Sequence, residues 1–258
     1  MVIGLLIGLR IMKQRLDKLI FDRGLVPSRE RAQSLIIAGK ILVDEQKIEK
    51  PGASVESDSV IRLLGEDLRY VSRGGLKLEK ALEHWRIDIA GKTCVDVGAS
   101  TGGFTDCLLQ HGAACVIAID TGRGQIDAKL RSDPRVRLLE QTNARYLTRE
   151  QLELGRRADL VAMDVAFISA TLVLPAVVAA AEPREIVVLV KPQFEVGRER
   201  VGSGGIVRIE ADQAAAVAKV REAIERLGGI KIEVAESPIT GAEGNREFLL
   251  HAAFPAKS

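Results

Sequence analysis

A glycine-rich loop at residues 98–103, GASTGG, is the clearest chemical signal in the chain. It follows the apolar run TCVDV and precedes the helical pattern DCLLQHG. Ligands of open α/β sheets bind at the carboxyl ends of strands, and glycines let a ligand approach the backbone closely because they lack a β-carbon. We therefore expect this loop to bind a cofactor.

The surroundings of the loop favour a ligand that carries a ribose. GASTGG lacks the G-x-G-x-x-G spacing of dinucleotide enzymes, although the bare loop could also cradle a pyrophosphate. Asp120 ends the next apolar run, VIAID, where a carboxylate suits a ribose diol. The remaining alternative is structural, with glycines that serve only a tight strand-to-helix turn.

Short apolar runs alternate with helical patterns from residue 93 onward, which predicts an α/β domain with a parallel sheet covered on both faces. The expected strands are TCVDV, CVIAI, VRLLE, DLVAMD, IVVLV, IKIEVAE and REFLLH, and the expected helices span residues 75–86, 104–111, 171–181 and 211–227. Asp164, Lys191 and Glu247 lie at ends of these strands. A doubly wound sheet exposes its active site at such ends.

The pattern before residue 64 is different and predicts a small α+β domain. A first helical stretch, KQRLDKLIFDRG, ends at Gly24, and a second begins at the N-cap type Ser28 and ends near Gly39. ILVDEQKI, with its polar centre, is typical of a hairpin, and SVIRLL of a last strand.

Four segments follow from these patterns. Residues 1–12 form an extension, 13–64 the small domain, 65–74 a polar linker and 75–258 the α/β domain. The extension, MVIGLLIGLRIM, is too short to span a bilayer and lacks the features of a signal peptide. We interpret Met12 as the initiator, with a membrane-touching segment as the alternative.

Composition limits the class of protein. The formal net charge is only +2, so nucleic-acid contacts must come from local clusters of Lys and Arg. Cys94, Cys107 and Cys115 are odd in number, lack CxxC spacing and lie among apolar neighbours. They predict buried thiols in a reducing compartment rather than a metal or redox site, and therefore a cytoplasmic protein. The most apolar run outside residues 1–12, LVLPAVVAAA, is short and contains Pro175, so no transmembrane helix and no stable membrane association are expected.

The segment from RLDKLIFDRG through KPGASV resembles the S4-type RNA-binding domain of ribosomal protein S4, pseudouridine synthases and tyrosyl-tRNA synthetases, and the resemblance covers most of residues 15–63. The pattern SRxxAxxxIxxGxIxVD, from residue 28 to residue 44, carries the resemblance. The resemblance implies RNA binding. The candidates for phosphate contacts are the basic side chains of Arg15, Arg29, Arg31 and Lys40, together with the helix N-terminus at Ser28. The alternative is a solvated surface, since Asp17, Asp22 and Glu30 lie nearby.

The loop itself lies in DVGASTGGFTDCLLQHGA, which resembles the S-adenosylmethionine motif of ribose 2′-O-methyltransferases related to FtsJ. SRGGxKLxxAL, TNAR, MDVAFIS, LVKPQFE and GNxEFLL add a resemblance to the TlyA family, also labelled hemolysin A, over nearly the whole chain. The resemblance implies a Rossmann-like domain that binds S-adenosylmethionine. The implied contacts are Gly98, Ala99, Ser100, Thr101, Gly102, Gly103 and Phe104 for methionine and ribose, Asp120 for the ribose hydroxyls, Asn143 and Ala144 for adenine, and Asp164 near the methyl group.

The resemblance further implies a Lys-Asp-Lys-Glu tetrad, with Lys77, Asp164, Lys191 and Glu247 as candidates. Methyl transfer to a hydroxyl is an in-line displacement that needs alignment and loss of the hydroxyl proton, and it requires no metal. Lys191 is the candidate that activates the hydroxyl, and Asp164 is the candidate that holds Lys191 in place. Lys77 and Glu247 would position the nucleotide, with Lys80 as an alternative to Lys77.

Three further features concern substrate fit. The loop PQFEVGRERVGSGGIV after Lys191 is a candidate basic flap over RNA, with Phe194 under a base or in the core. Ala166 in MDVAFIS replaces a serine that the family usually has, and Arg123 in TGRGQ replaces an aromatic residue. Both departures affect details of cofactor or substrate binding.

The leading hypothesis is therefore a ribosomal RNA 2′-O-methyltransferase, with ribosomal RNA or ribosomal subunits as partners and cytidine as the target that the family implies. One alternative is an RNA-binding or ribosome-assembly factor with an inactive methyltransferase fold. The other is a hemolysin, for which only residues 1–12 could supply a membrane-active segment. Amino-group methylation is disfavoured because an NPPY-like motif is absent from the sequence.

Overall fold

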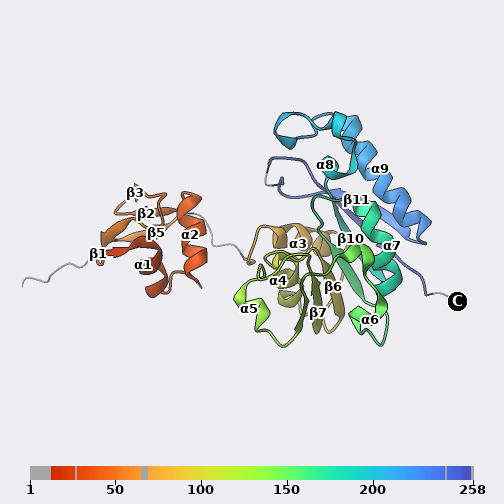
Figure 1. The fold of residues 1–258 in the computed structure, drawn as a ribbon, viewed down its shortest axis with the longest axis horizontal. Helices are drawn as coiled ribbons and strands as arrows, with labels where there is room; N and C mark the ends of the chain where they lie inside the picture. The colour runs from red at the N-terminus through yellow and green to blue at the C-terminus, as the bar shows by residue number, and fades with distance from the viewer. Residues whose placement is uncertain (1–12, 27, 65–68, 242, 257–258) are drawn as a thin grey trace, which may run out of the picture. The chain divides into compact units, whose positions relative to one another are not determined.

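Two units follow one another along the chain, residues 1–67 and residues 68–258 (Figure 1). The computed structural model describes residues 13–26, 28–64, 69–241 and 243–256. The expected extension of residues 1–12, and with it the interpretation of Met12, lies outside the described residues. The described part of the expected linker, residues 69–74, lies in the second unit, where Tyr70 is 2% exposed.

The first unit is a small α+β domain. Its elements are β1 (Lys13–Arg15), α1 (Leu16–Asp22), α2 (Arg29–Ile37), β2 (Ile41–Val43), β3 (Gln46–Lys47), β4 (Ser54–Glu56) and β5 (Ile61–Leu63). β2 pairs antiparallel with both β3 and β5, and β1 pairs antiparallel with β4. Leu16, Ile20, Ile36 and Ile41 are fully buried in one cluster, so both helices share a core with β2.

Two local features of this unit show what sequence patterns can and cannot detect. Ser28 caps α2 as expected, because its hydroxyl accepts a hydrogen bond from Arg31 N at 3.1 Å. The first helix was expected to include Lys13, but Lys13–Arg15 form a strand paired with Ser54–Glu56. Helical periodicity cannot reveal a strand partner about 40 residues away, and β4 itself was not expected.

The second unit contains the seven expected strands and the four expected helices. In chain order its elements are α3 (Gly74–His84), β6 (Thr93–Val97), α4 (Gly103–Gln110), β7 (Cys115–Ile119), α5 (Ala128–Arg131), β8 (Val136–Leu139), η1 (Ala144–Tyr146), α6 (Arg149–Leu152), β9 (Leu160–Met163), α7 (Ala170–Ala181), β10 (Glu185–Val190), α8 (Pro192–Glu195), η2 (Arg198–Arg200), η3 (Ser203–Gly205), α9 (Glu210–Arg226), β11 (Ile230–Glu236) and β12 (Phe248–Ala253).

These strands form one sheet in the order β11-β12-β10-β9-β6-β7-β8. β10, β9, β6, β7 and β8 are parallel, and β12 runs antiparallel to both of its neighbours, β10 and β11. β11 therefore keeps the direction of the parallel strands, and the expectation of a wholly parallel sheet is wrong for β12 alone. A parallel connection needs a crossover of a dozen or more residues, usually a helix. The segment between β11 and β12 is shorter and contains no helix among its described residues.

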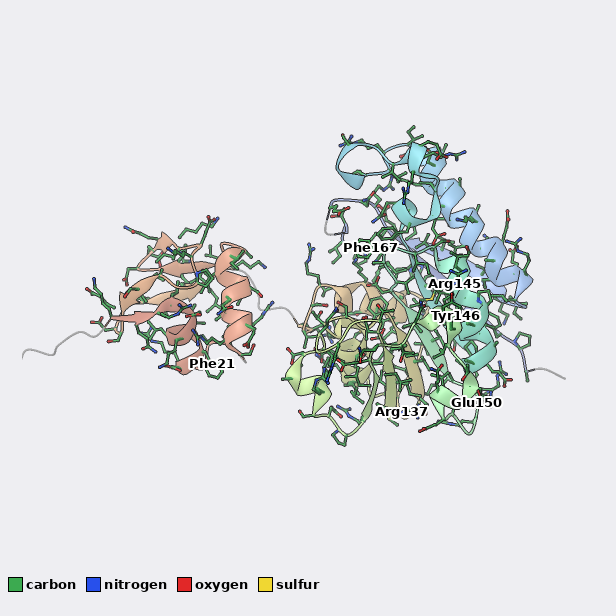
Figure 2. All side chains as sticks on the ribbon, viewed as in Figure 1. Phe21, Arg137, Arg145, Tyr146, Glu150 and Phe167 are labelled. Atoms are coloured by element: carbon green, nitrogen blue, oxygen red, sulfur yellow. The ribbon has the colours of Figure 1, made fainter. Side chains whose placement is uncertain are left out.

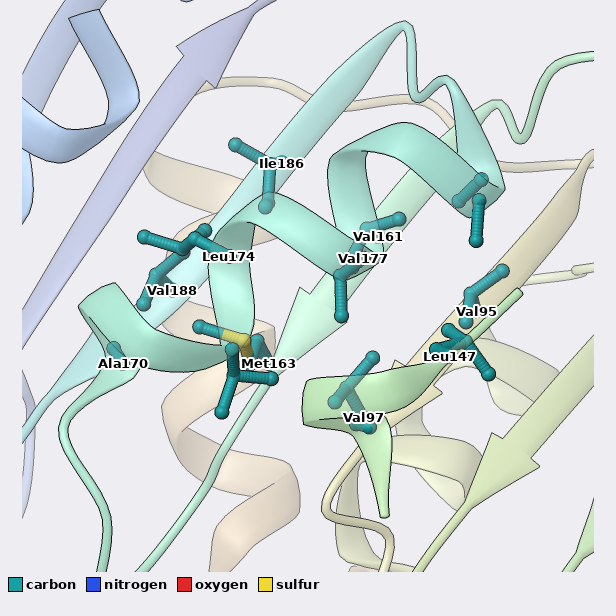
Figure 3. Close-up of a cluster of buried hydrophobic side chains, with 14 of the residues drawn as sticks. Val95, Val97, Leu147, Val161, Met163, Ala170, Leu174, Val177, Ile186 and Val188 are labelled. Atoms are coloured by element: carbon teal, nitrogen blue, oxygen red, sulfur yellow. The ribbon is translucent and has the colours of Figure 1, made fainter. Parts of the chain in front are cut away.

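Helices cover both faces of the sheet (Figure 1). Alternate residues of β6 separate the two cores, since Val95 and Val97 face the cluster that includes α7, whereas Cys94 faces the cluster that includes α3 and α4. Figure 3 shows the α7 side, where Leu174 and Val177 pack over the strands. Apolar side chains on both faces fix the strands, and thereby the residues that follow their ends. Cys94 and Cys107 are buried and Cys115 is partly buried.

Candidate active site

Charged residues far apart in the sequence meet at the carboxyl edge of the parallel strands. Asp164 follows β9 and Lys191 follows β10, and these two strands are parallel neighbours. Lys191 Nζ lies 2.5 Å from Asp164 Oδ1, with side-chain exposures of 14% and 20%. Asp164 Oδ1 has no aligned hydrogen-bond donor among the described residues, so this contact is an ion pair at a poor hydrogen-bond angle.

A second ion pair comes from the antiparallel strand. Glu247 precedes β12, and because β12 runs against β10, its beginning lies at the edge where β10 ends, with Phe248 opposite Val190. Lys77 of α3 donates from Nζ to Glu247 Oε2 at 2.5 Å, and Glu247 is only 3% exposed. Lys80, the alternative to Lys77, is exposed.

All four tetrad candidates line one cavity of about 270 Å³, together with the glycine-rich loop. Buried ion pairs seldom add much stability, because desolvation of two charges offsets their attraction. Lys77–Glu247 is such a buried pair and Asp164–Lys191 is partly buried, so two pairs at one strand edge are better explained by a function than by folding. Whether these residues catalyse a reaction stays a prediction at this point.

The glycine-rich loop is held by close backbone packing. Gly98 has φ +89°, and a β-carbon there would lie 2.2 Å from the carbonyl oxygen of Asp164. A β-carbon at Gly103 would lie 2.2 Å from Ser72 Oγ and 3.0 Å from Gly75 N. Gly98 thus sets the distance between the loop and the catalytic aspartate candidate, and Gly103 admits the segment before α3.

A second cavity of about 260 Å³ adjoins the first and shares Gly98, Ser100 and Asp164 with it. Asp120, Asn143 and Ala144 line it, as does the departure Ala166, which is exposed. The other expected cofactor residues, Ala99, Thr101, Gly103 and Phe104, line the first cavity, whereas Gly102 lines neither.

Asp120 is one of two acidic residues that line the second cavity, the other being Asp164. Its Oδ2 accepts a hydrogen bond from Ser100 N at 2.8 Å, and its Oδ1 accepts one from Gly122 N at 2.6 Å. Asn143 Oδ1 accepts from Arg145 N at 3.0 Å and thereby caps η1. Both side chains are fixed by the backbone of their own loops, so they need little reorganisation to meet a ligand.

Sequence reasoning missed several residues of this site. Ser72, Arg73, Gly74 and Thr240 line the first cavity. The first three belong to the motif SRGGxKLxxAL, which could have pointed to them, whereas Thr240 gave no comparable signal. Phe167 lines the second cavity, is 91% exposed and has φ +63° (Figure 2). Its ring lies 5.5 Å from that of Phe194, centroid to centroid.

Asp96 lies beneath the loop and is fully buried. Burial raises the pKa of its carboxyl to about 7, although a 2.6 Å hydrogen bond from Thr105 Oγ1 acts in the opposite direction. Below about pH 4 both the folded and the unfolded chain carry this proton. Between about pH 4 and 7 only the unfolded chain releases it, so the contribution of Asp96 to stability falls as pH rises.

We predict that Asp96→Asn removes this pH dependence. The wild-type free energy of unfolding, relative to that of the variant, should fall by roughly 4 kcal/mol between pH 4 and 7, as a shift of about three pKa units implies. Urea unfolding of both proteins across this range measures the difference. A difference that is constant with pH would show that Asp96 is ionised in the folded protein already at pH 4.

The basic residues expected to contact RNA lie in the first unit, where Asp17 organises two of them. Asp17 is 0% exposed and accepts hydrogen bonds from Arg15, Arg29 and Gln33 at 2.8–3.2 Å. The hydrogen bond from Arg15 is the main reason that the pKa of this carboxyl lies far below its usual range. Asp17 therefore fixes two guanidinium groups that stay half exposed, rather than simply cancelling their charge.

The other RNA-contact candidates are less clustered. Arg31 lies in the first turn of α2, and Lys40 lies beyond the opposite end of that helix. Both are partly buried, and Ser28 is occupied as the helix cap.

Two findings concern other classes of site. No group of three or more His, Cys, Asp or Glu residues in the described part of the chain could hold a metal ion. Among the same residues, no helix combines the length and apolarity that a bilayer crossing requires.

Comparisons with known proteins agree with this geometry. The FtsJ-like methyltransferase family matches residues 70–254, and the S4 domain matches residues 14–61. The Mycobacterium tuberculosis protein named 16S/23S rRNA (cytidine-2′-O)-methyltransferase TlyA is 46% identical over 240 residues, 92% of this chain and 89% of that protein. A Bacillus subtilis protein provisionally named an rRNA methyltransferase, YqxC, is 44% identical over 246 residues, 95% of this chain and 87% of its own.

A solved structure from Streptococcus thermophilus, provisionally named a hemolysin, has a TM-score of 0.73 and 40% identity over 96% of this chain and 90% of its own. The family match covers more than half of the chain, and the relatives span almost all of it. The chain therefore belongs to the FtsJ-like methyltransferases and, with its S4 domain, to their TlyA family.

Proposed function

We propose that this protein transfers the methyl group of S-adenosylmethionine to a ribose 2′-hydroxyl of ribosomal RNA, with cytidine as the target base. The observation that carries the proposal is the convergence of Lys77, Asp164, Lys191 and Glu247 as two ion pairs beside the glycine-rich loop. The name of the tuberculosis relative supplies the nucleotide and the kind of RNA.

The two adjoining cavities fit S-adenosylmethionine. The second cavity combines apolar walls, such as Ile119 and Val165, with Asp120 and Asn143, which suits a nucleoside. The residues that would hold the cofactor are Gly98, Ala99, Ser100, Thr101, Gly102, Gly103, Phe104, Asp120, Asn143, Ala144 and Asp164. The cofactor supplies an electrophilic methyl group on a sulfonium, and the carboxylate of Asp164, shared by both cavities, lies where it would stabilise that positive charge.

Lys191 is the group that we assign to the hydroxyl proton. Its ammonium is held by Asp164 and lies in the same cavity as the glycine-rich loop, so a ribose hydroxyl placed there would meet Nζ. Nζ either polarises the hydroxyl or, when neutral, takes its proton. Lys77 donates a hydrogen bond to Glu247, and this pair forms part of the wall of the first cavity against which the ribose would be oriented.

The aromatic pair Phe167 and Phe194 provides a surface for the target base. A ring that is 91% exposed and lies three residues after Asp164 can stack on a base that has been turned out of the RNA strand. The loop after Phe194 adds Arg198 and Arg200 as candidates for phosphate contacts.

We assign RNA binding to the first unit. Arg15, Arg29, Arg31 and Lys40 are the proposed phosphate contacts, with Ser28 at the helix N-terminus. We predict that the double variant Arg15→Gln/Arg29→Gln binds ribosomal RNA more weakly and reduces the slope of log Kd against log salt by about two, because two phosphate contacts are lost. Affinity for S-adenosylmethionine should not change. Filter binding at several salt concentrations measures the slope.

Arg62→Gln is the matched control, since Arg62 is also about half exposed and ion-paired, but with the exposed Glu45 rather than with Asp17. An unchanged salt slope in the double variant would exclude Arg15 and Arg29 from the RNA interface.

The reaction itself is tested by incubating the protein with labelled S-adenosylmethionine and purified ribosomal RNA, followed by alkaline hydrolysis. A methyl group on the 2′-oxygen blocks cleavage of the adjacent phosphodiester, so the label should appear in an alkali-resistant dinucleotide. Label in a single nucleotide would show base methylation instead. Cofactor binding without transfer to any RNA would favour an assembly factor with an inactive fold.

A further inference from the structure

Glu195, in the motif LVKPQFE, is a buried carboxylate that the proposed chemistry does not use. Its side chain is only 2% exposed, although it lies four residues after Lys191 in α8. Oε2 accepts a hydrogen bond from Ser169 Oγ at 2.5 Å, and Oε1 accepts one from Ala170 N at 2.6 Å. One carboxylate thus links α8 to the beginning of α7.

The donors around Glu195 have a fixed direction. An ionised carboxylate only accepts hydrogen bonds, so the single hydroxyl proton of Ser169 is donated to Glu195. Thr171 then donates to Ser169 Oγ, from its hydroxyl at 2.8 Å and from its backbone N at 3.3 Å. Since backbone N–H groups in the first turn of a helix have no partner within the helix, Glu195 also satisfies one of these at Ala170.

A third element holds the same residue. Lys219 of α9 donates from Nζ to the backbone carbonyl of Glu195 at 2.7 Å and lies 3.4 Å from Oε2. Its ammonium compensates the buried negative charge, which would otherwise be strongly unfavourable. Glu195 therefore joins α7, α8 and α9 at one point.

The contact between Glu195 and Ser169 joins the same two segments that carry the catalytic candidates Asp164 and Lys191. Residues 164–169 follow β9, and residues 191–195 follow β10. The two segments touch at their beginnings through Asp164 and Lys191, and at their ends through Ser169 and Glu195. A pair of loops attached at both ends has far less freedom than a pair attached at one.

The aromatic pair lies between these two attachments. Phe167 has φ +63°, a conformation that is about 1–2 kcal/mol unfavourable for a residue with a β-carbon. Such a conformation persists only where the surrounding structure imposes it. Because Phe167 is 91% exposed, its own side chain buries little surface that could do so, and the hydrogen bonds at Ser169 and Ala170 anchor the loop that carries it.

From these contacts we infer that Glu195 is a positioning residue for methyl transfer, a clamp that sets the two loops carrying Asp164, Phe167, Lys191 and Phe194 in register. The inference rests on the proposed function for its kinetic consequence. Glu195 touches neither substrate nor cofactor in this account, and it acts through the geometry of the Asp164–Lys191 pair and of the aromatic surface.

The test compares Glu195→Gln and Glu195→Ala with the wild type in single-turnover methyl transfer to the ribosomal subunit that the wild type modifies. Misplacement of reacting groups by about 1 Å can slow a reaction by about a hundredfold. We expect the alanine variant to be slower by about that factor and the glutamine variant, which keeps one acceptor oxygen, by about tenfold. Affinity for S-adenosylmethionine and Tm should stay near wild type in the glutamine variant.

Hydrogen–deuterium exchange supplies a readout that needs no RNA. Amides of residues 165–170 and 193–196 should exchange faster in Glu195→Gln, because local opening becomes easier when the loops are attached at one end only. The matched control is Glu185→Gln, which removes the partner of His251 at the opposite end of β10 and should change neither the rate nor the exchange of these loops.

The outcomes separate the clamp from the reaction. A wild-type single-turnover rate in Glu195→Gln overturns the positioning role, whatever the exchange data show. If Glu195→Ala does not fold, the glutamine variant alone decides. Absence of transfer in the wild type would overturn the proposed function, and faster exchange confined to both loops would then still support the clamp.

Discussion

Lys191→Ala is expected to lower methyl transfer by about 10²–10⁴-fold, the range for loss of a positioned group that handles a proton. The variant should bind S-adenosylmethionine almost as the wild type does, because Lys191 lies outside the glycine-rich loop and Asp120 and Asn143 are unaffected. Single-turnover transfer to ribosomal subunits and calorimetric cofactor titration measure the two effects separately.

Lys80→Ala is the matched control for Lys191→Ala. Lys80 is exposed on α3, one helical turn from Lys77, and it should be dispensable if Lys77 is the tetrad lysine. Full turnover in Lys191→Ala would show that the proposed mechanism is wrong. If Lys80→Ala lowered methyl transfer as much as Lys77→Ala does, the assignment of Lys77 rather than Lys80 to the tetrad would be wrong.

Gly98→Ala is the second substitution with a large expected effect, and it acts on the cofactor. The new β-carbon would lie 2.2 Å from the backbone oxygen of Asp164, so either the loop or Asp164 must move. The backbone strain at φ +89° adds about 1–2 kcal/mol. We expect affinity for S-adenosylmethionine to fall by at least about tenfold, which corresponds to roughly 1.4 kcal/mol, and methyl transfer to fall with it.

Gly124→Ala is the control that introduces backbone strain without a steric clash. Gly124 also has positive φ, +70°, but a β-carbon there would meet nothing within 4 Å. This variant should lose some stability and keep its cofactor affinity. Equal losses of affinity in the two variants would mean that backbone strain alone, rather than the contact between Gly98 and Asp164, explains the effect.

The sequence predicts the layered architecture because apolar runs and helical periodicity report local burial. It does not reveal strand direction. β12 was expected to be parallel, yet its antiparallel course is what brings Glu247 to the edge where Lys191 lies. Glu247 was therefore correctly expected to lie near Lys191. The strand direction that brings it there could not be predicted from local patterns.

The pairing of charges was only partly predicted from the sequence. Asp164 was expected to hold Lys191, and the structure pairs these two, whereas the direct ion pair between Lys77 and Glu247 was not expected. Asp17 was considered only as a neutralising charge, but it is buried and orients Arg15 and Arg29. Such roles depend on contacts between side chains from different elements, which no periodicity encodes.

Methyl transfer from labelled S-adenosylmethionine to purified 30S and 50S subunits, followed by nuclease digestion and mass spectrometry, tests the central claim most directly. Lys191→Ala serves as the inactive control. The proposed function predicts a 2′-O-methylated cytidine in at least one subunit with the wild type and at least about a hundredfold slower formation of it with the variant. Bound cofactor without transfer to either subunit, or a methyl group on a base, would contradict it.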